Sequence, residues 1–370
     1  MTPLIEQESP MRLGVIGLGL IAQAVHLQNL QTLREKYQVT HVCDLSATLA
    51  AQVAAEYGGP VRHSTDAAEV LADPEVDAVL ILTPGTHAYL ARRALEAGKH
   101  VLAEKPFAHT TAECLELDAL AAAKGLVLQV AYMKMYDPIM ARARAELAGL
   151  GALRLVRVTV LHPDDDPQFA HQRHLRYGDV DPAAVDTSYE RAKAAEAVGD
   201  LGEPYVSIYT DVLQGSVVHE LSVLRALFGE QPLTIAHAQA AGLKPGVKLE
   251  EPPQLQALGT LGDAQLSLSW NWLPDFPDYG EEIAVFGSAG RLYLSMPGPY
   301  LRDARAELVV ESVQGGERAT TRLVSDHRTG FVHELLAFHA SVTEGAPVLS
   351  TATGAAYDTA ALQQIARSLA

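Results

Sequence analysis

The strongest constraint on the fold is an alternation that repeats through the first third of the chain. From residue 12 to residue 130, short runs of consecutive apolar residues alternate with stretches of helical character. Strands that are apolar along their whole length are typical of a parallel sheet covered by helices on both faces. The apolar runs lie at 13–17, 39–44, 77–83, 100–105 and 126–132. We therefore predict an α/β domain with a parallel sheet.

The second half of the chain has a different rhythm. From about residue 151, segments such as 153–162 and 264–272 alternate apolar and polar residues, and glycine-containing turns separate many of them. This pattern predicts a large, mostly antiparallel sheet with one buried face and one wetter face. A helix over 207–228 interrupts the strands and should pack on the buried face. Helical stretches over 331–344 and 353–369 close the chain.

The totals exclude several classes of protein. At about 150 residues per domain, 370 residues indicate two or three domains. The net charge of −17 repels nucleic acids and anionic membranes, so we expect neither as a partner. Cys43 and Cys114 are too few for a disulfide framework, and no apolar run is long enough to span a membrane. Residues 1–10 have no signal-peptide pattern and read as a disordered tail. We expect a cytoplasmic protein.

A glycine-rich turn follows the first apolar run. Gly17 permits a tight turn, Gly19 lets a pyrophosphate approach the backbone, and Ala22 allows close packing of helix on strand. Asp44 ends the second strand, where its carboxylate can accept a hydrogen bond from a ribose 2′-hydroxyl and repel a 2′-phosphate. The whole turn comprises Gly17, Leu18, Gly19, Leu20, Ile21 and Ala22. Together these residues predict binding of NAD in preference to NADP.

Two further groups follow apolar strands, at the sheet edge where α/β proteins bind ligands. Thr83, Pro84 and His87 come after the third run and are expected to contact the cofactor, as are Glu104 and Lys105. His87 could instead simply start the next helix. Glu104 and Lys105 close the fourth run. Burying an unpaired charge is costly, so they form either an internal pair or part of a ligand cleft. In a cleft, Lys105 could hold a substrate hydroxyl or polarise its oxygen.

These motifs, in this order, resemble the glucose–fructose oxidoreductase, inositol dehydrogenase and MocA family. The likeness covers nearly all of residues 11–370, and the Glu-Lys-Pro block at 104–106 is its most specific part. The resemblance implies hydride transfer between nicotinamide and an alcohol carbon of a sugar, cyclitol or glycoside. It also implies that Lys105 contacts the reacting hydroxyl and that the Lys105–Pro106 peptide bond is often cis.

The resemblance gives the domain organisation its names. We expect a Rossmann NAD-binding domain over 11–131 and an α+β domain over 132–350 that serves substrate binding and oligomer contacts. The helix at 353–369 is expected to pack back on the first domain. A homodimer or homotetramer formed through the second sheet is the expected assembly.

The helix around 211–229 carries the acid/base candidate but departs from the family pattern. His219 matches the family's histidine, whereas Gly215 stands where many members have an aspartate one turn earlier. Asp211 lies two turns from His219, too far to orient it, though near enough to touch the far end of a substrate. Glu220 should point about 100° away from His219. The sequence offers no clear substitute for the missing carboxylate. The expected substrate contacts are Lys105, Tyr132, Lys134, Asp211, Gly215 and His219.

The segment 163–205 and two tryptophans complete the candidates. The segment is polar, contains four prolines and is long for a connection inside a domain, which makes it functional or disordered. A solvated loop over the substrate is favoured there over a metal site, because no paired ligand spacing occurs. Trp270 and Trp272 share a strand face and suit core packing or a dimer interface. The ligand-like side chains at the segment's start are His162, Asp164, Asp165, Asp166, His171 and His174.

The residues and the resemblance together imply an NAD-dependent dehydrogenase with Lys105 and His219 as catalytic groups and no metal. Two alternatives stay open. One is an enzyme of the same class that recycles a tightly held cofactor between two sugars. The other is a catalytically silent sensor that binds the dinucleotide, because the usual carboxylate is missing.

Overall fold

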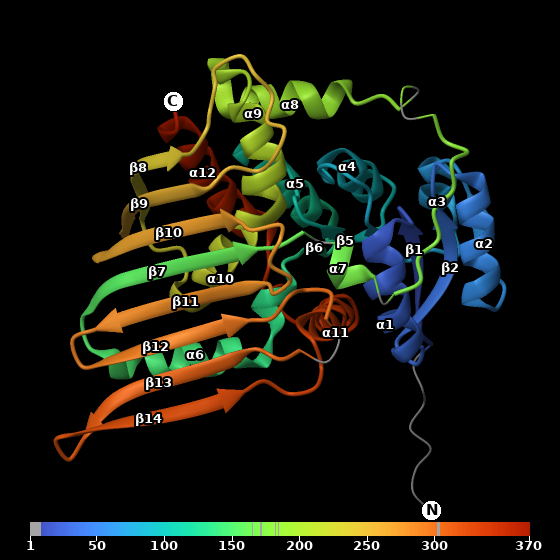
Figure 1. The fold of residues 1–370 in the computed structure, drawn as a ribbon. Coiled ribbons are helices and arrows are strands. Elements are labelled where there is room, and N and C mark those ends of the chain that lie inside the picture. The colour runs from blue at the N-terminus through green and yellow to red at the C-terminus, as the bar shows by residue number, and fades with distance from the viewer. Residues whose placement is uncertain (1–8, 165, 171, 182, 184, 302–303) are drawn as a thin grey trace, which may run out of the picture.

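The computed structural model describes residues 9–164, 166–170, 172–181, 183, 185–301 and 304–370 (Figure 1). Most of the predicted tail at 1–10, together with Asp165 and His171, therefore lies outside the described residues. Two sheets organise the described chain, and helices lie around and between them. None of the described helices has the length and apolar character that crossing a membrane requires.

The first sheet has six parallel strands in the order β3-β2-β1-β4-β5-β6. The order reverses between β1 and β4, and ligands bind at such a switch point in α/β proteins. Sequence patterning missed β3 and α3, because both elements are short and β3 is mostly exposed. The strands are β1 Met11–Ile16, β2 Tyr37–Cys43, β3 Arg62–Ser64, β4 Ala78–Ile81, β5 His100–Glu104 and β6 Leu128–Ala131. The helices are η1 Ala22–His26, α1 Leu27–Thr32, α2 Ala47–Tyr57, α3 Ala67–Ala72, α4 Ala88–Glu96 and α5 Thr111–Lys124.

The second sheet has eight strands in the order β14-β13-β12-β11-β7-β10-β9-β8. All neighbours are antiparallel except β7 and β10 at its centre, which run parallel. Both the parallel sheet of the first domain and the mostly antiparallel sheet of the second are thus confirmed. The strands are β7 Leu153–His162, β8 Leu233–Ala240, β9 Leu255–Leu261, β10 Ala264–Trp272, β11 Gly280–Gly287, β12 Gly290–Met296, β13 Glu307–Gln314 and β14 Glu317–Val324.

Helices cover one face of the second sheet and connect it to the first (Figure 1). The last helix packs against both α5 of the first domain and β8 of the second. One hydrophobic cluster accordingly contains buried residues of both domains, such as Val79 and Leu266. The helices are η2 Met133–Tyr136, α6 Pro138–Leu147, η3 Ala148–Leu150, α10 Val218–Phe228, α11 Gly330–Thr343 and α12 Ala352–Ser368.

The stretch predicted as one regular helix over 207–228 is not regular. It begins with α9, Tyr205–Ser207, continues as the π-helix η6, Ile208–Val217, and becomes α-helical only in α10. π-helical turns use i→i+5 hydrogen bonds and often occur at functional sites. The prediction that Gly215 and Asp211 lie one and two regular α-helical turns before His219 is therefore wrong within this stretch.

The long segment after β7 lies along the first domain (green in Figure 1). It contains α7, Asp166–Phe169, α8, Ser188–Val198, and the short η5, Gly199–Leu201. Between α7 and α8, described residues of this segment contact the first domain through hydrogen bonds of Leu175 and Asp179.

Candidate functional site

The glycine-rich turn has the geometry that a dinucleotide requires. Gly17 has φ of +93°, and a Cβ there would lie 2.7 Å from the backbone of Leu82 and Thr83. A side chain at Gly17 is therefore excluded by both conformation and space. A Cβ at Gly19, in contrast, would meet nothing within 4 Å. The backbone at Gly19 is open to an incoming group, and the residues present fit a bound pyrophosphate.

Asp44 is fixed beside this turn. One carboxylate oxygen accepts a hydrogen bond from the Leu18 amide at 2.9 Å, and the other accepts from the Ser46 amide at 2.9 Å. Asp44 follows β2 directly and is half-buried. The acid thus stands at the carboxyl edge of the sheet, at the position where a ribose hydroxyl would be recognised.

The buried side chain of His87 stabilises the loop after β4 through hydrogen bonds. The side chain of His87 is 1% exposed, and its two ring nitrogens face the carbonyl oxygens of Pro106 at 2.8 Å and Thr83 at 2.9 Å. The structure therefore gives His87 a bracing role within the protein, and the prediction of direct cofactor contact is wrong for its side chain. Thr83 is half-buried and Pro84 exposed at the same edge.

Glu104 orients the residue that follows it. Its carboxylate accepts from His26 Nε2 at 3.0 Å and from the Lys105 amide at 3.0 Å. Burial alone would raise the pKa of Glu104, but the hydrogen bond from His26 and the charges of His26 and Lys105 lower it. Since its side chain is 8% exposed, Glu104 acts as an internal anchor for Lys105 and not as a surface ligand.

Lys105 links the two domains at the candidate site. Its ammonium Nζ donates to the carbonyl oxygen of Gly215 at 2.6 Å, and the Lys105–Pro106 bond is cis. The carbonyl belongs to the π-helical stretch, and a Cβ added at Gly215 would meet only the Thr210 carbonyl, at 3.8 Å. A main-chain carbonyl thus contacts Lys105 at the position where many family members have a carboxylate.

His219 lies in the first turn of α10 and is half-buried. Burial, followed by the positive charges of Lys105 and Lys134 and the nearby His162, lowers its pKa well below the ordinary value. Its buried Nδ1 meets no hydrogen-bond partner among the described residues. His219 is therefore a neutral imidazole at neutral pH, able to accept a proton.

Lys134 lies in a buried ion cluster beside His219. Its ammonium contacts Glu281 and Glu220, and Tyr279 donates to Glu281 at 2.6 Å. Burial and the charge of Glu281 raise the pKa of Glu220 to about 8. Lys134 is only 4% exposed, so its role in the structure is to place a positive charge near His219. Sequence reasoning missed Glu281, and it considered Glu220 only as a residue that points away from His219.

Two other predicted substrate residues lie elsewhere. Tyr132 is 1% exposed and stacks under the guanidinium of Arg225, so the prediction that it contacts substrate is wrong. Asp211 is exposed and accepts a hydrogen bond from Thr210 at 2.7 Å. A contact of Asp211 with substrate stays a prediction.

Aromatic rings form one side of the site. The ring of His162 lies 5.5 Å from Trp270, 5.6 Å from Trp272 and 5.6 Å from Tyr279. Trp270 is buried and donates to Ser216 Oγ at 2.8 Å, which agrees with its predicted core position, whereas Trp272 is half-exposed. The period-two pattern of β7 places His162 on the same face as its buried valines, which was an available signal for its inward position.

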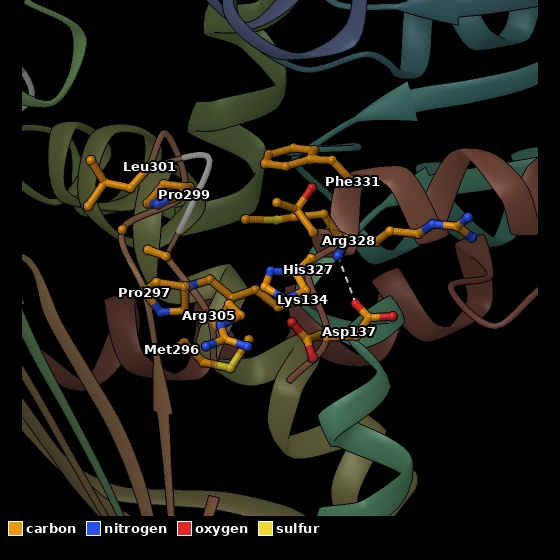
Figure 2. A pocket seen from close by; sticks show the side chains of 16 residues that line it. Lys134, Asp137, Met296, Pro297, Pro299, Leu301, Arg305, His327, Arg328 and Phe331 are labelled. Atoms are coloured by element: carbon orange, nitrogen blue, oxygen red, sulfur yellow. Dashed lines mark hydrogen bonds between the residues drawn. The ribbon is translucent and has the colours of Figure 1, made fainter. Parts of the chain in front are cut away.

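A small cavity has Lys134 of this region in its lining. It measures about 50 Å³ and lies between η2, the start of α11 and the loop after β12. Figure 2 shows Lys134, Arg305, His327 and Phe331 around it. Lys105 and His219 are not among its lining residues. Within the described parts of the chain, no three His, Cys, Asp or Glu side chains are grouped as metal ligands.

The turn, the acid after β2 and the switch point define the first domain as a dinucleotide-binding domain. Residues 11–132 match the profile of the family described as "Oxidoreductase family, NAD-binding Rossmann fold", GFO_IDH_MocA. The first domain is therefore similar to the NAD-binding domain of the Gfo/Idh/MocA oxidoreductases.

Comparison with known proteins extends the match along the chain. Inositol 2-dehydrogenase 1 of Saccharopolyspora erythraea is 39% identical over 130 residues, which are 35% of this chain and 38% of that protein. Inositol 2-dehydrogenase 3 of the same organism is 28% identical over 78% of this chain and 74% of its own length. The match to inositol 2-dehydrogenase 1 thus covers well under half of that protein's length. The solved structure of UDP-N-acetylglucosamine 3-dehydrogenase from Acidithiobacillus ferrooxidans has a TM-score of 0.69 at 23% identity, covering 97% of this chain and 98% of that one. This likeness concerns the fold.

Proposed function

We propose that this protein is an NAD-dependent dehydrogenase that acts on a secondary alcohol of a sugar, cyclitol or glycoside. The observation that carries the proposal is the hydrogen bond from Lys105 to Gly215 in η6, which leads directly into α10 with His219. It joins the carboxyl edge of the nucleotide-binding sheet to the second domain. Relatives named as dehydrogenases of inositol and of UDP-N-acetylglucosamine support this class of substrate.

Lys105 and His219 have different roles in the proposed reaction. A bound nicotinamide supplies the hydride acceptor or donor. Lys105 holds and polarises the substrate oxygen with its ammonium, because Glu104 fixes the backbone amide of Lys105 at the end of β5. His219 takes the hydroxyl proton during oxidation and returns it in reduction, since its lowered pKa keeps the base neutral.

The finer parts of the proposal rest on particular side chains. Asp44 favours NAD over NADP, because a carboxylate near the ribose repels a 2′-phosphate. The half-exposed Trp272 offers a ring on which the apolar face of a sugar can stack.

A homodimer or homotetramer forms through the uncovered face of the second sheet, where Leu161 and Leu258 are exposed. The cytoplasm is the proposed compartment, consistent with two buried free cysteines.

The test is a scan of cyclitols, sugars and methyl glycosides for NADH formation, with NAD binding followed in parallel by thermal shift. Lys105→Ala should lower turnover at least about 100-fold while changing NAD affinity far less. Lys124→Ala, an exposed lysine on α5, is the matched control and should retain full turnover. NAD binding without turnover on any alcohol would favour the sensor. Unchanged turnover in Lys105→Ala would remove Lys105 from the mechanism.

A further inference from the structure

The segment between β7 and α8 crosses the loops that form the dinucleotide site. The backbone of Leu175 makes two hydrogen bonds with the side-chain carboxamide of Gln23. The same carboxamide also donates to Leu18 O in the glycine-rich turn. At the far end, the Glu190 carboxylate accepts from the Thr86 amide at 2.9 Å and from the Thr86 hydroxyl at 2.8 Å. These contacts fall on the loops after β1 and β4. The segment thus runs along the carboxyl edge of the sheet.

Between these two anchors, Asp179 docks on the start of α2. One carboxylate oxygen accepts from the Ser46 hydroxyl at 2.5 Å, and the other accepts from the Thr48 amide at 3.1 Å. The hydrogen bonds from Ser46 and Thr48 lower the pKa of Asp179 to about 2, so the group is ionised. A carboxylate distant in sequence therefore occupies the positive end of an 11-residue helix.

Two carboxylates meet at one residue. Asp44 accepts from the backbone amide of Ser46, and Asp179 accepts from its hydroxyl. Asp44 is the acid expected to receive the ribose 2′-hydroxyl, so Asp179 stands directly beyond it. The donors that Asp179 occupies, a serine hydroxyl and an amide at a helix start, are those that a 2′-phosphate would use.

We propose that Asp179 is a specificity-determining residue that excludes NADP by occupying the 2′-phosphate position. This inference rests on the proposed dinucleotide site but not on any particular substrate. Two effects combine: a phosphate would have to displace the carboxylate from Ser46 and Thr48, and it would face two negative charges in place of one. NAD has no group at that position and is accommodated with the segment docked.

The experiment measures dissociation constants for NADH and NADPH by fluorescence titration, at low and high salt. Asp179→Asn removes the charge and keeps the side-chain shape, whereas Asp179→Ala also removes the docking. Both should lower the ratio of the NADPH to the NADH dissociation constant at least about tenfold, and high salt should weaken the discrimination of the unmodified protein. Asp181→Asn is the control and should leave the ratio unchanged, because Asp181 is a nearby exposed aspartate that accepts from the Ala183 amide.

The outcomes separate this inference from the proposed function. An unchanged ratio in folded Asp179 variants, or an equal shift in Asp181→Asn, overturns the role of Asp179 while leaving the dehydrogenase intact. A shifted ratio in a protein that oxidises no alcohol supports Asp179 and contradicts the dehydrogenase. If the unmodified protein binds neither nucleotide, both proposals fail.

Discussion

At the scale of single residues, Gly215 is the position where the sequence departs from the pattern of the family that it resembles. Its carbonyl receives the Lys105 ammonium, and the space beside its Cα is open. After burial, the causes that lower the pKa of His219 are its electrostatic interactions with Lys105, Lys134 and His162. A neutral carbonyl cannot offset them as a carboxylate would, so His219 remains a weak base that is neutral over a wide pH range.

Restoring the carboxylate should change that range. In Gly215→Asp, the new negative charge should lie near Lys105 and His219 and raise the pKa of the histidine. Because oxidation requires the neutral base, the acid limb of the pH–rate profile should move to higher pH. Gly215→Asn has nearly the same shape without the charge, and its profile should stay in place.

These profiles also test His219 itself. A His219→Ala protein that retains most turnover, together with an unshifted Gly215→Asp profile, would contradict the assigned role of His219. Lys105 would then be the remaining acid/base candidate. A shift in the Asn variant as large as that in the Asp variant would show that filled space, and not charge, controls the base.

Residues differ in how far the sequence alone could place them. Gly17, Gly19 and Asp44 were predictable because each answers a local demand of the strand–turn–helix unit. The position of Gly215 was not, because its contact with Lys105 depends on π-helical winding that the apolar pattern does not encode. Glu220 and Glu281 meet at Lys134 only through tertiary packing, so no sequence spacing could have paired them.

At the scale of secondary-structure elements, the strands of the second sheet were the most predictable. Their period-two alternation predicted β7 and β10 at their observed bounds, because one face is buried and the other is not. Short β3 lacked an apolar run. The contacts made by the segment after β7 depend on Asp179 and Glu190 reaching loops distant in sequence, which local patterning cannot reveal.

The packing of α10 on α12 depends on a buried ion pair. Arg225 Nη2 lies 2.9 Å from Asp358 Oδ2, with both side chains almost fully buried. Removing one partner leaves the other charge buried and unpaired in the core. Asp358→Ala should therefore lower the free energy of unfolding by about 3–5 kcal/mol. The exposed pair of Arg157 and Glu282 is the comparison, and Glu282→Ala should cost less than about 1 kcal/mol. Urea denaturation of the two variants measures both values, and equal losses would contradict the argument.

At the scale of the whole molecule, the shared core predicts joint unfolding of the two domains. One buried cluster includes residues from both sheets, and α12 packs against both domains. Both tryptophans, Trp270 and Trp272, lie in the second domain, whereas far-ultraviolet circular dichroism reports on both. The urea midpoints of tryptophan fluorescence and circular dichroism should therefore coincide. Two separated transitions would show that each domain is stable alone.

The position of α12 also bears on how the chain folds during synthesis. Many proteins complete their N-terminal domain while later residues are still being made. Here the helix that covers α5 of the first domain consists of residues 352–368, and the amide of Val130 in β6 bonds to the carbonyl of Ser350. A nascent chain on the ribosome therefore exposes part of its nucleotide-binding domain until this last helix emerges. During that interval the uncovered flank of α5 is a surface that chaperones would have to protect.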